Sequence, residues 1–151
     1  GVRAVQGVSF RAAPGAVTSI IGPNGAGKTS ALNLLCGFYR PQAGTVMLGD
    51  RDVTGMTSHL LARVGVARTF QTTQLFGSLT ILENILLAER VGRLGGLVSA
   101  LRNAETEGFA RLLLRFAGVD GDVDRLADSL SHGEKRLVEI ARALEIGRAH
   151  V

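Results

Sequence analysis

The residues with the clearest chemistry form a glycine-rich run, Gly22-Pro23-Asn24-Gly25-Ala26-Gly27-Lys28-Thr29-Ser30. Their spacing fits GxxxxGK[ST], the pattern of phosphate-binding loops, or P-loops. Glycines allow a turn so tight that successive backbone N–H groups point at an anion, and the helix that follows adds a partial positive charge. Lys28 would place an ammonium between the β- and γ-phosphates of a nucleotide, and the Thr29 hydroxyl would ligate Mg²⁺. The run predicts a nucleoside triphosphate site; a glycine-rich turn with an exposed lysine is the alternative.

A second candidate anion site lies at residues 130–136, which read Leu-Ser-His-Gly-Glu-Lys-Arg. Ser131 with Glu134 three residues later is the pattern of a helix-capping box, and the apolar series that follows predicts a helix. Capping alone explains this pattern. A helix start with exposed N–H groups, a small hydroxyl and Gly133 in its first turn is also able to approach a phosphate. Both interpretations stay open at this point.

The elements that must position these motifs are predicted from apolar patterns. Residues 17–21 form a β-branched, apolar run that ends in glycine, which indicates a buried parallel strand directly before the P-loop. Residues 28–36 predict a helix with an apolar side, closed by Gly37. Further strands are predicted at 4–10, 46–50 and 64–70, and a short helix at 58–63. This strand, loop and helix order is the setting that a P-loop requires.

From residue 80 onward the pattern becomes helical. Thr80 and Glu83 predict a second capping box at the start of a helix. A glycine-punctuated stretch at 92–96 separates it from another helix, which is expected to end at Gly118. That helix is expected to pack through one apolar stripe formed by Phe109, Leu112, Leu113 and Phe116.

Together these motifs resemble those of the ATP-binding cassette (ABC) ATPases. Residues 130–134, LSHGE, resemble the family's LSGGQ-type signature, although His132 and Glu134 depart from its commonest letters. Arg68-Thr69-Phe70-Gln71 matches the Q-loop, and LFGSLT followed by Glu83-Asn84 resembles the start of the helical subdomain. The strings IGPNGAGKTS, CGFYRPQAG, ARTFQTTQLF and VEIARAL are most similar to the ATP-binding subunit of branched-chain amino acid importers.

The resemblance implies an α/β fold: a P-loop NTPase core with an antiparallel β subdomain and a helical signature subdomain. Residues 1–144 are expected to form a partial ABC ATP-binding domain that is incomplete at its C-terminus. Within it, residues 1–79 would hold the core with the P-loop and Q-loop, 80–130 the helical subdomain and 131–144 the signature helix. Residues 146–151 match the in-frame translation of a sequencing-adapter string, so 145–151 are expected to be a non-native tail.

The resemblance also implies the roles of the site residues. ATP and Mg²⁺ are the expected cofactors, with residues 22–30 binding the nucleotide, Thr29 and Gln71 contacting Mg²⁺, and Lys28 and Gln71 as catalytic residues. The residues that would bind the nucleotide of a second ATP-binding subunit in trans are Ser131, His132, Gly133 and Glu134. The Walker B aspartate, the catalytic glutamate and the switch histidine of the family have no counterpart among the 151 residues. ATP hydrolysis is therefore expected of a full-length parent, and the fragment is expected to be inactive.

The expected function is ATP-driven solute import, with branched-chain amino acids as the solute, at the cytoplasmic face of the membrane. Transmembrane permease subunits would be direct partners and a periplasmic solute-binding protein an indirect one. The alternatives are another ABC importer or exporter, such as one for lipopolysaccharide, and a non-transport ABC protein acting on nucleic acid or the ribosome. The 17 basic and 13 acidic residues are interspersed, so the net charge of +4 does not indicate a nucleic-acid partner.

Overall fold

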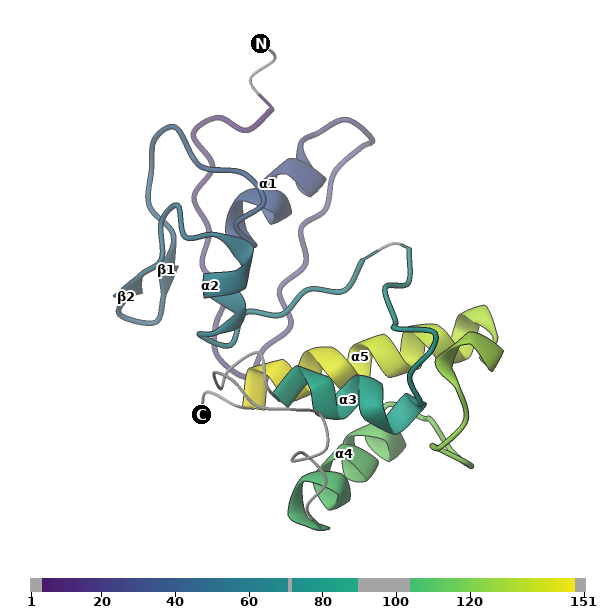
Figure 1. Ribbon diagram of the computed structural model, residues 1–151. Coiled ribbons are helices and arrows are strands. Elements are labelled where there is room, and N and C mark those ends of the chain that lie inside the picture. Colours follow the sequence, from purple (N-terminus) through teal and green to yellow (C-terminus); the bar gives the residue numbers. More distant parts are fainter. Residues whose placement is uncertain (1–3, 71, 90–103, 149–151) are drawn as a thin grey trace. The chain divides into compact units, whose positions relative to one another are not determined.

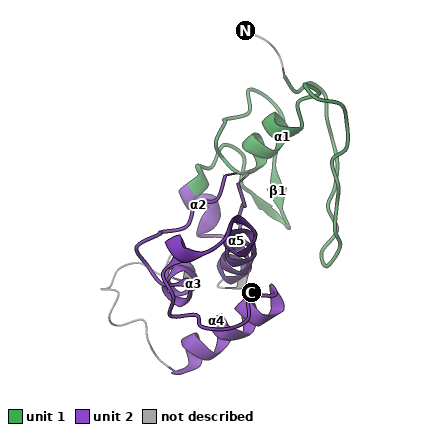
Figure 2. Ribbon diagram, turned by 90° about the vertical axis from the view of Figure 1, so that its right-hand side faces the viewer, with its two compact units in different colours: residues 1–58 green, residues 59–151 purple. Residues whose placement is uncertain are grey.

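The computed structural model describes residues 4–70, 72–89 and 104–148 of the chain. The chain divides into two compact units, one ending at Ser58 and the other beginning at His59 (Figure 2). The helices are α1 (Lys28–Leu35), α2 (Ser58–Ala62), α3 (Ile81–Glu89), α4 (Ala104–Phe116) and α5 (His132–Arg148), with a short 3₁₀ turn, η3 (Ala127–Ser129). The strands are β1 (Met47–Leu48) and β2 (Arg51–Asp52) (Figure 1). None of the helices within the described ranges has both the length and the apolar character needed to cross a bilayer.

The hairpin of the first unit confirms the strand and turn predicted at 46–50. Its strands β1 and β2 pair antiparallel, with Met47 opposite Asp52 and Leu48 opposite Arg51. The turn between them contains Gly49, whose φ of 58° is in the left-handed region that favours glycine. Next to the hairpin, the N–H of Val53 donates to the carbonyl of Val46 at 3.0 Å. Val53 is the one buried residue that the structure describes in this unit.

The strands predicted at 4–10, 17–21 and 64–70 are not formed in the described structure. Val17 and Ile21, expected to be buried, have exposed fractions of 97% and 91%. A strand is stabilised by hydrogen bonds to a neighbouring strand, and no described segment pairs with these three. The prediction of strands at these positions was therefore wrong for this chain, because an apolar run forms a strand only when another segment pairs with it.

The helix predicted at 28–36 is confirmed as α1. Its C-cap is Cys36, and Gly37 follows with a φ of 70°, as expected for the residue that ends a helix. The carbonyl of Asn33 accepts hydrogen bonds from the N–H groups of Phe38 and Tyr39 at 2.9 and 3.2 Å. The expected apolar side is not buried, since α1 has no buried residue.

The core of the second unit lies where α3, α4 and α5 pack against one another (Figure 1). The first N–H groups of α3 donate to carbonyl groups of the segment 123–125. Ile81 donates to the carbonyl of Arg125 and Leu82 to that of Val123, both at 3.0 Å. This pairing ties the start of α3 to the chain that leads into α5. The buried core cluster consists of Ile81, Leu82, Ile85, Leu86, Ala110, Leu114, Val119, Val123, Ala127, Leu130, Val138 and Ala141.

Helix α4 packs through a different face from the one predicted. The exposed fractions of Leu112 and Phe116 are 58% and 78%, so two of the four expected stripe residues lie at the surface. The face that packs is displaced by one residue and consists of Ala110, Leu113, Leu114 and Ala117. Both series have the same helical spacing, so periodicity alone did not distinguish them. The expected end of the helix is confirmed, because Gly118 follows α4 with a φ of 85°.

Two neighbouring leucines of α4 test this assignment directly. Leu114→Ala is expected to lower the free energy of unfolding by about 2–4 kcal/mol, because it leaves a cavity in the core. Leu112→Ala, two residues away on the exposed side, is expected to cost less than about 1 kcal/mol. Urea titrations followed by far-UV circular dichroism measure both values. Equal losses, or a larger loss for Leu112→Ala, would restore the stripe predicted from the sequence.

The two predicted capping boxes are confirmed. In the first, the N–H of Thr80 donates to Glu83 Oε2 at 2.8 Å, and the N–H of Glu83 donates to Thr80 Oγ1 at 3.1 Å. The glycine-punctuated stretch at 92–96 lies outside the described residues. Helix α5 continues to Arg148, and Glu145 is buried. The non-native origin of residues 145–151 stays a prediction, which sequencing of an unamplified genomic template would test.

Candidate functional site

The P-loop residues form a turn that leads directly into α1 in the first unit. Gly25 and Gly27 have φ values of 82° and 85°, a conformation that side chains with a Cβ rarely adopt. Gly27 is also the N-cap of α1, and a Cβ at this position would collide with the backbone carbonyl oxygen of Ala4. Both glycines are therefore required by the backbone path and not only by the expected approach of a phosphate.

The ammonium of Lys28 lies over this turn. Its Nζ donates hydrogen bonds to the carbonyl oxygens of Gly22 and Pro23, each at 2.7 Å. The side chain therefore folds back across the loop and places its charge beside the backbone that is expected to surround the phosphates. A compact ammonium suits this position, since its three N–H donors can point in several directions.

The start of α1 supplies the other donors that an anion needs. Within the described part of the chain, the N–H groups of Lys28, Thr29 and Ser30 have no hydrogen-bond acceptor, whereas the N–H of Ala31 already donates to Gly27. Three unsatisfied donors at a helix N-terminus, next to a lysine ammonium, fit a nucleotide's phosphates. No group of three or more acidic, histidine or cysteine side chains that could hold a metal is present in the described ranges. Mg²⁺ commonly binds through substrate phosphates and one or two protein oxygens, which here fits Thr29.

Each predicted partner of the P-loop lies either outside the described residues or in the other compact unit. Gln71, expected to contact Mg²⁺ and the attacking water, lies outside the described residues. The signature residues 131–134 belong to the second compact unit, while the P-loop belongs to the first.

The signature segment is a capped helix start with donors left over. The N–H of Ser131 donates to Glu134 Oε2 at 2.8 Å, and the N–H of Glu134 donates to Ser131 Oγ at 3.3 Å. This confirms the capping interpretation. The N–H groups of His132 and Gly133 find no acceptor among the residues that the structure covers, and a Cβ built on Gly133 would meet nothing within 4 Å. The space beside Gly133 is open, so the anion-binding interpretation remains compatible with the cap.

Glu134 is held by a residue that the sequence analysis did not find. Arg125 Nη2 lies 2.9 Å from Glu134 Oε1, while Arg125 Nε donates to the carbonyl of Asp122 at 3.3 Å. The hydrogen bonds from the N–H and hydroxyl of Ser131, followed by the bond from Arg125, lower the pKa of Glu134 to about 2. The carboxylate that replaces the usual glutamine of the signature thus has its charge balanced by the guanidinium.

This pKa shift predicts a pH dependence of stability. The pKa is about 2 in the folded chain and 4.5 as its ordinary value, so ionised Glu134 stabilises the start of α5 above about pH 4.5. That contribution is lost as the pH falls from about 4.5 to about 2, where the folded form takes up its proton. We expect Glu134→Gln to have a flatter dependence of the urea midpoint on pH in this window, with Asp122→Asn as the control carboxyl variant. A Glu134→Gln curve parallel to that of the unsubstituted chain would contradict the assignment.

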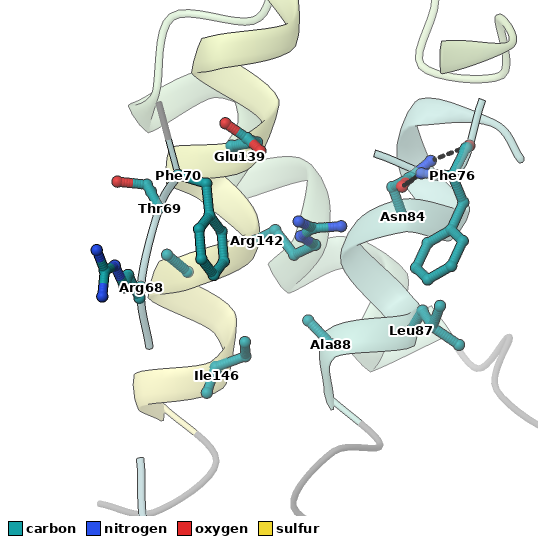
Figure 3. Close-up of a pocket in the computed structure, with 11 residues that line it drawn as sticks. Arg68, Thr69, Phe70, Phe76, Asn84, Leu87, Ala88, Glu139, Arg142 and Ile146 are labelled. Atoms are coloured by element: carbon teal, nitrogen blue, oxygen red, sulfur yellow. Dashed lines mark hydrogen bonds between the residues drawn. The ribbon is translucent and has the colours of Figure 1, made fainter. Parts of the chain in front are cut away.

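A cavity of about 230 Å³ lies within the second unit, between α3, α5 and the segment before the predicted Q-loop glutamine (Figure 3). Most of its lining is apolar, and Arg68 covers the ring of Phe70 with 5.4 Å between the guanidinium carbon and the ring centre. Burial lowers the pKa of Arg142, an effect that the nearby charge of Glu139 partly opposes. The lining residues are Arg68, Thr69, Phe70, Phe76, Asn84, Leu87, Ala88, Glu139, Arg142, Ala143 and Ile146.

The profile of the ABC transporter family matches residues 5–148. The chain is 40% identical over 152 aligned positions to the high-affinity branched-chain amino acid transport ATP-binding protein LivG of Escherichia coli K12, covering 95% of this chain and 60% of LivG. It is 39% identical to BraF of Pseudomonas aeruginosa, with the same coverage. The ribose import ATP-binding protein RbsA 1 of Rhizobium meliloti is 41% identical, over 97% of this chain and 28% of RbsA 1. The chain thus spans less than two thirds of these relatives.

Solved structures show the same relationship. The ATP-binding cassette MJ1267 superimposes with a TM-score of 0.77 at 37% identity, covering 95% of this chain and 59% of that one. The dimeric cassette MJ0796 matches with a TM-score of 0.67 at 26% identity, over 82% of this chain and 53% of that one. The fold class predicted from the sequence is therefore confirmed, although three of its expected strands are not paired here.

Proposed function

Because the chain belongs to the ABC transporter family, we propose that it is part of an ATP-binding subunit that couples ATP binding and hydrolysis to solute import. Branched-chain amino acids are the proposed solute, on the similarity to LivG and BraF, whose names state that transport. The observation that carries the proposal is the P-loop, where the Lys28 ammonium lies over a glycine turn and three N–H donors begin α1. The cofactors are ATP and Mg²⁺.

In this proposal residues 22–30 hold the phosphates of ATP. The unsatisfied N–H groups of Lys28, Thr29 and Ser30 donate to phosphate oxygens, and the Lys28 ammonium exchanges its present carbonyl acceptors for the β- and γ-phosphates. Thr29 and Gln71 would provide oxygen ligands to Mg²⁺, and Gln71 would also orient the attacking water. Mg²⁺ supplies neutralisation of the charge that develops on the transferred phosphoryl group.

The signature is proposed to act on the nucleotide of a second ATP-binding subunit. The open N–H groups of His132 and Gly133 support this role, and the dimeric form of MJ0796 is an assembly of the same family. Ser131 contributes its hydroxyl, while Glu134 acts through the cap that it shares with Ser131. The division into a core at 1–79, a helical subdomain at 80–130 and a signature helix at 131–144 is part of this proposal.

We propose the cavity of the second unit as the contact with the permease subunits at the cytoplasmic face of the membrane. Its lining is mostly apolar, and Phe76 presents an exposed ring at its edge. Phe70 is the residue directly before Gln71, so a permease segment seated here would lie beside the Q-loop. The periplasmic solute-binding protein would act through the permease and would not touch this chain.

Uptake measurements test the proposed import. Disrupting the gene in its host is expected to reduce uptake of radiolabelled leucine, isoleucine and valine, and the intact gene is expected to restore it. A gene carrying Lys28→Ala is expected to fail, while one carrying Arg115→Ala, which removes an exposed cation of α4, is expected to restore uptake. Ribose uptake is the second arm, because of the similarity to RbsA 1. Loss of ribose uptake alone would reassign the solute, and unchanged uptake of all four compounds would overturn the import proposal.

A further inference from the structure

Two charged residues of α5 hold the segment that flanks the predicted Q-loop glutamine. Arg136 and Glu139 are one helical turn apart, and their side chains lie 3.3 Å from each other, Nη1 to Oε2. Glu139 Oε1 accepts the backbone N–H of Gln74 at 2.6 Å. Arg136 Nη1 also donates to the backbone carbonyl of Phe70. The pair therefore makes hydrogen bonds to the backbone both before and after residue 71.

The position of Glu139 is unusual for a carboxylate. Glu139 has an exposed fraction of 2%, and Val138, which precedes it in the sequence, is fully buried in the core of the second unit. A buried charge is costly unless it is paired and hydrogen-bonded, and both carboxylate oxygens of Glu139 have partners. A leucine at this position would serve core packing without that cost. The carboxylate is thus explained by the bonds that it makes, and charge-assisted bonds of this kind are strong.

Those bonds go to a segment that has no regular structure of its own. The described residues from 66 to 76 include neither helix nor strand, so no ladder of backbone bonds fixes them. Figure 3 shows Phe70 beside the face of α5 that carries Glu139 and Arg142. Within this segment α5 holds Phe70 and Gln74, the latter through Glu139, 65 residues further along the chain, whereas Phe76 is bonded to Asn84 of α3.

We propose that Arg136 and Glu139 are positioning residues that make the Q-loop move together with the signature helix. Helix α5 begins directly after Ser131, so a displacement of its start would be passed to Phe70 and Gln74 through the pair. The inference rests on the proposed function for its meaning, because that function assigns nucleotide contacts to Gln71 and to the signature. The contacts themselves do not depend on it.

Hydrogen exchange of the 151-residue chain, read by mass spectrometry, tests this proposal. Glu139→Ala is expected to speed exchange of the 72–76 amides by about 10-fold relative to those of 132–144, because the acceptor of Gln74 is lost. Glu139→Gln keeps an oxygen at that place and is expected to restore the protection of Gln74. Arg136→Ala is expected to loosen the same segment, and Arg136→Lys to restore part of the protection. Val138→Ala, a destabilising neighbour, is the matched control and should speed exchange in both segments in proportion.

The proposal is overturned if exchange of 72–76, normalised to 132–144, is the same in Glu139→Ala and Arg136→Ala as in Val138→Ala. It is also overturned if Glu139→Gln loosens the segment as much as Glu139→Ala does. Should Glu139→Ala unfold, the comparison of Glu139→Gln and Arg136→Lys with Val138→Ala decides. Protection of residues 22–30 by Mg²⁺ and ATP is read from the same samples. Its absence would count against the proposed function and leave the result on 72–76 standing.

Discussion

Lys28→Ala is expected to lower the affinity of the chain for ATP in the presence of Mg²⁺ by about 100-fold or more, since each lost hydrogen bond to a charged group contributes about 1.5–3 kcal/mol. The ammonium already lies over the loop, bonded to the carbonyls of Gly22 and Pro23 at 2.7 Å. Its removal takes away the one side-chain cation of the P-loop but leaves the N–H donors of α1 in place. Equilibrium binding of a fluorescent ATP analogue measures the change.

Arg115 provides the matched control for this experiment. It is an exposed residue in the last turn of α4 and lies outside both the P-loop and residues 130–136. Arg115→Ala also removes one positive charge and is expected to leave the affinity within about twofold of its original value. Lys28→Arg is expected to recover only part of the loss, because a planar guanidinium does not reproduce a compact ammonium. Equal affinities for Lys28→Ala and Arg115→Ala would remove Lys28 from the nucleotide site.

A large loss of stability, about 2–4 kcal/mol, is expected from Asn84→Leu, since it removes the three hydrogen bonds of a buried side chain and leaves the N–H of Phe76 without an acceptor. Asn84 is fully buried on α3. Its Oδ1 accepts the N–H of Phe76 at 2.9 Å, and its Nδ2 donates to the carbonyls of Phe76 and Thr80 at 3.0 and 2.9 Å. Because the carbonyl of Thr80 also accepts the N–H of Asn84, and the carbonyl of Phe76 accepts the N–H of Leu79, only the N–H of Phe76 loses its partner completely.

Urea denaturation followed by circular dichroism measures this effect. Asn84→Asp is the informative second variant, because it keeps the acceptor for Phe76 but loses the two donors and buries a charge. Phe116→Ser is the surface control and is expected to change stability by less than about 0.5 kcal/mol. A loss below about 1 kcal/mol for Asn84→Leu would contradict a stabilising role for the three hydrogen bonds of Asn84.

Features determined by neighbouring residues were predictable from the sequence. The P-loop turn depends on glycines within eight positions, and both capping boxes depend on a hydroxyl and a carboxylate three residues apart. The ends of α1 and α4 follow from single glycines that adopt a positive φ. In each case the deciding interaction lies within one or two turns of chain, so local sequence carries the information.

Features determined by distant partners were not predictable in the same way. The run at 17–21 has the composition of a strand, but strand formation depends on a neighbour that composition does not specify. The packing face of α4 was misplaced because Leu113 belongs to two overlapping apolar series. The bonds of Arg136 and Glu139 span 66 and 65 residues, and no short pattern marks such a pair.

A competition experiment with ATP, ADP and AMP tests the central claim, that residues 22–30 bind a nucleotide through its phosphates. The P-loop donors and the Lys28 ammonium are expected to contact the β- and γ-phosphates. ATP and ADP should therefore displace a fluorescent ATP analogue from the chain in the presence of Mg²⁺, while AMP should not displace it at equal concentration. Displacement by AMP as effective as that by ATP, or binding that persists unchanged in Lys28→Ala, would contradict the account.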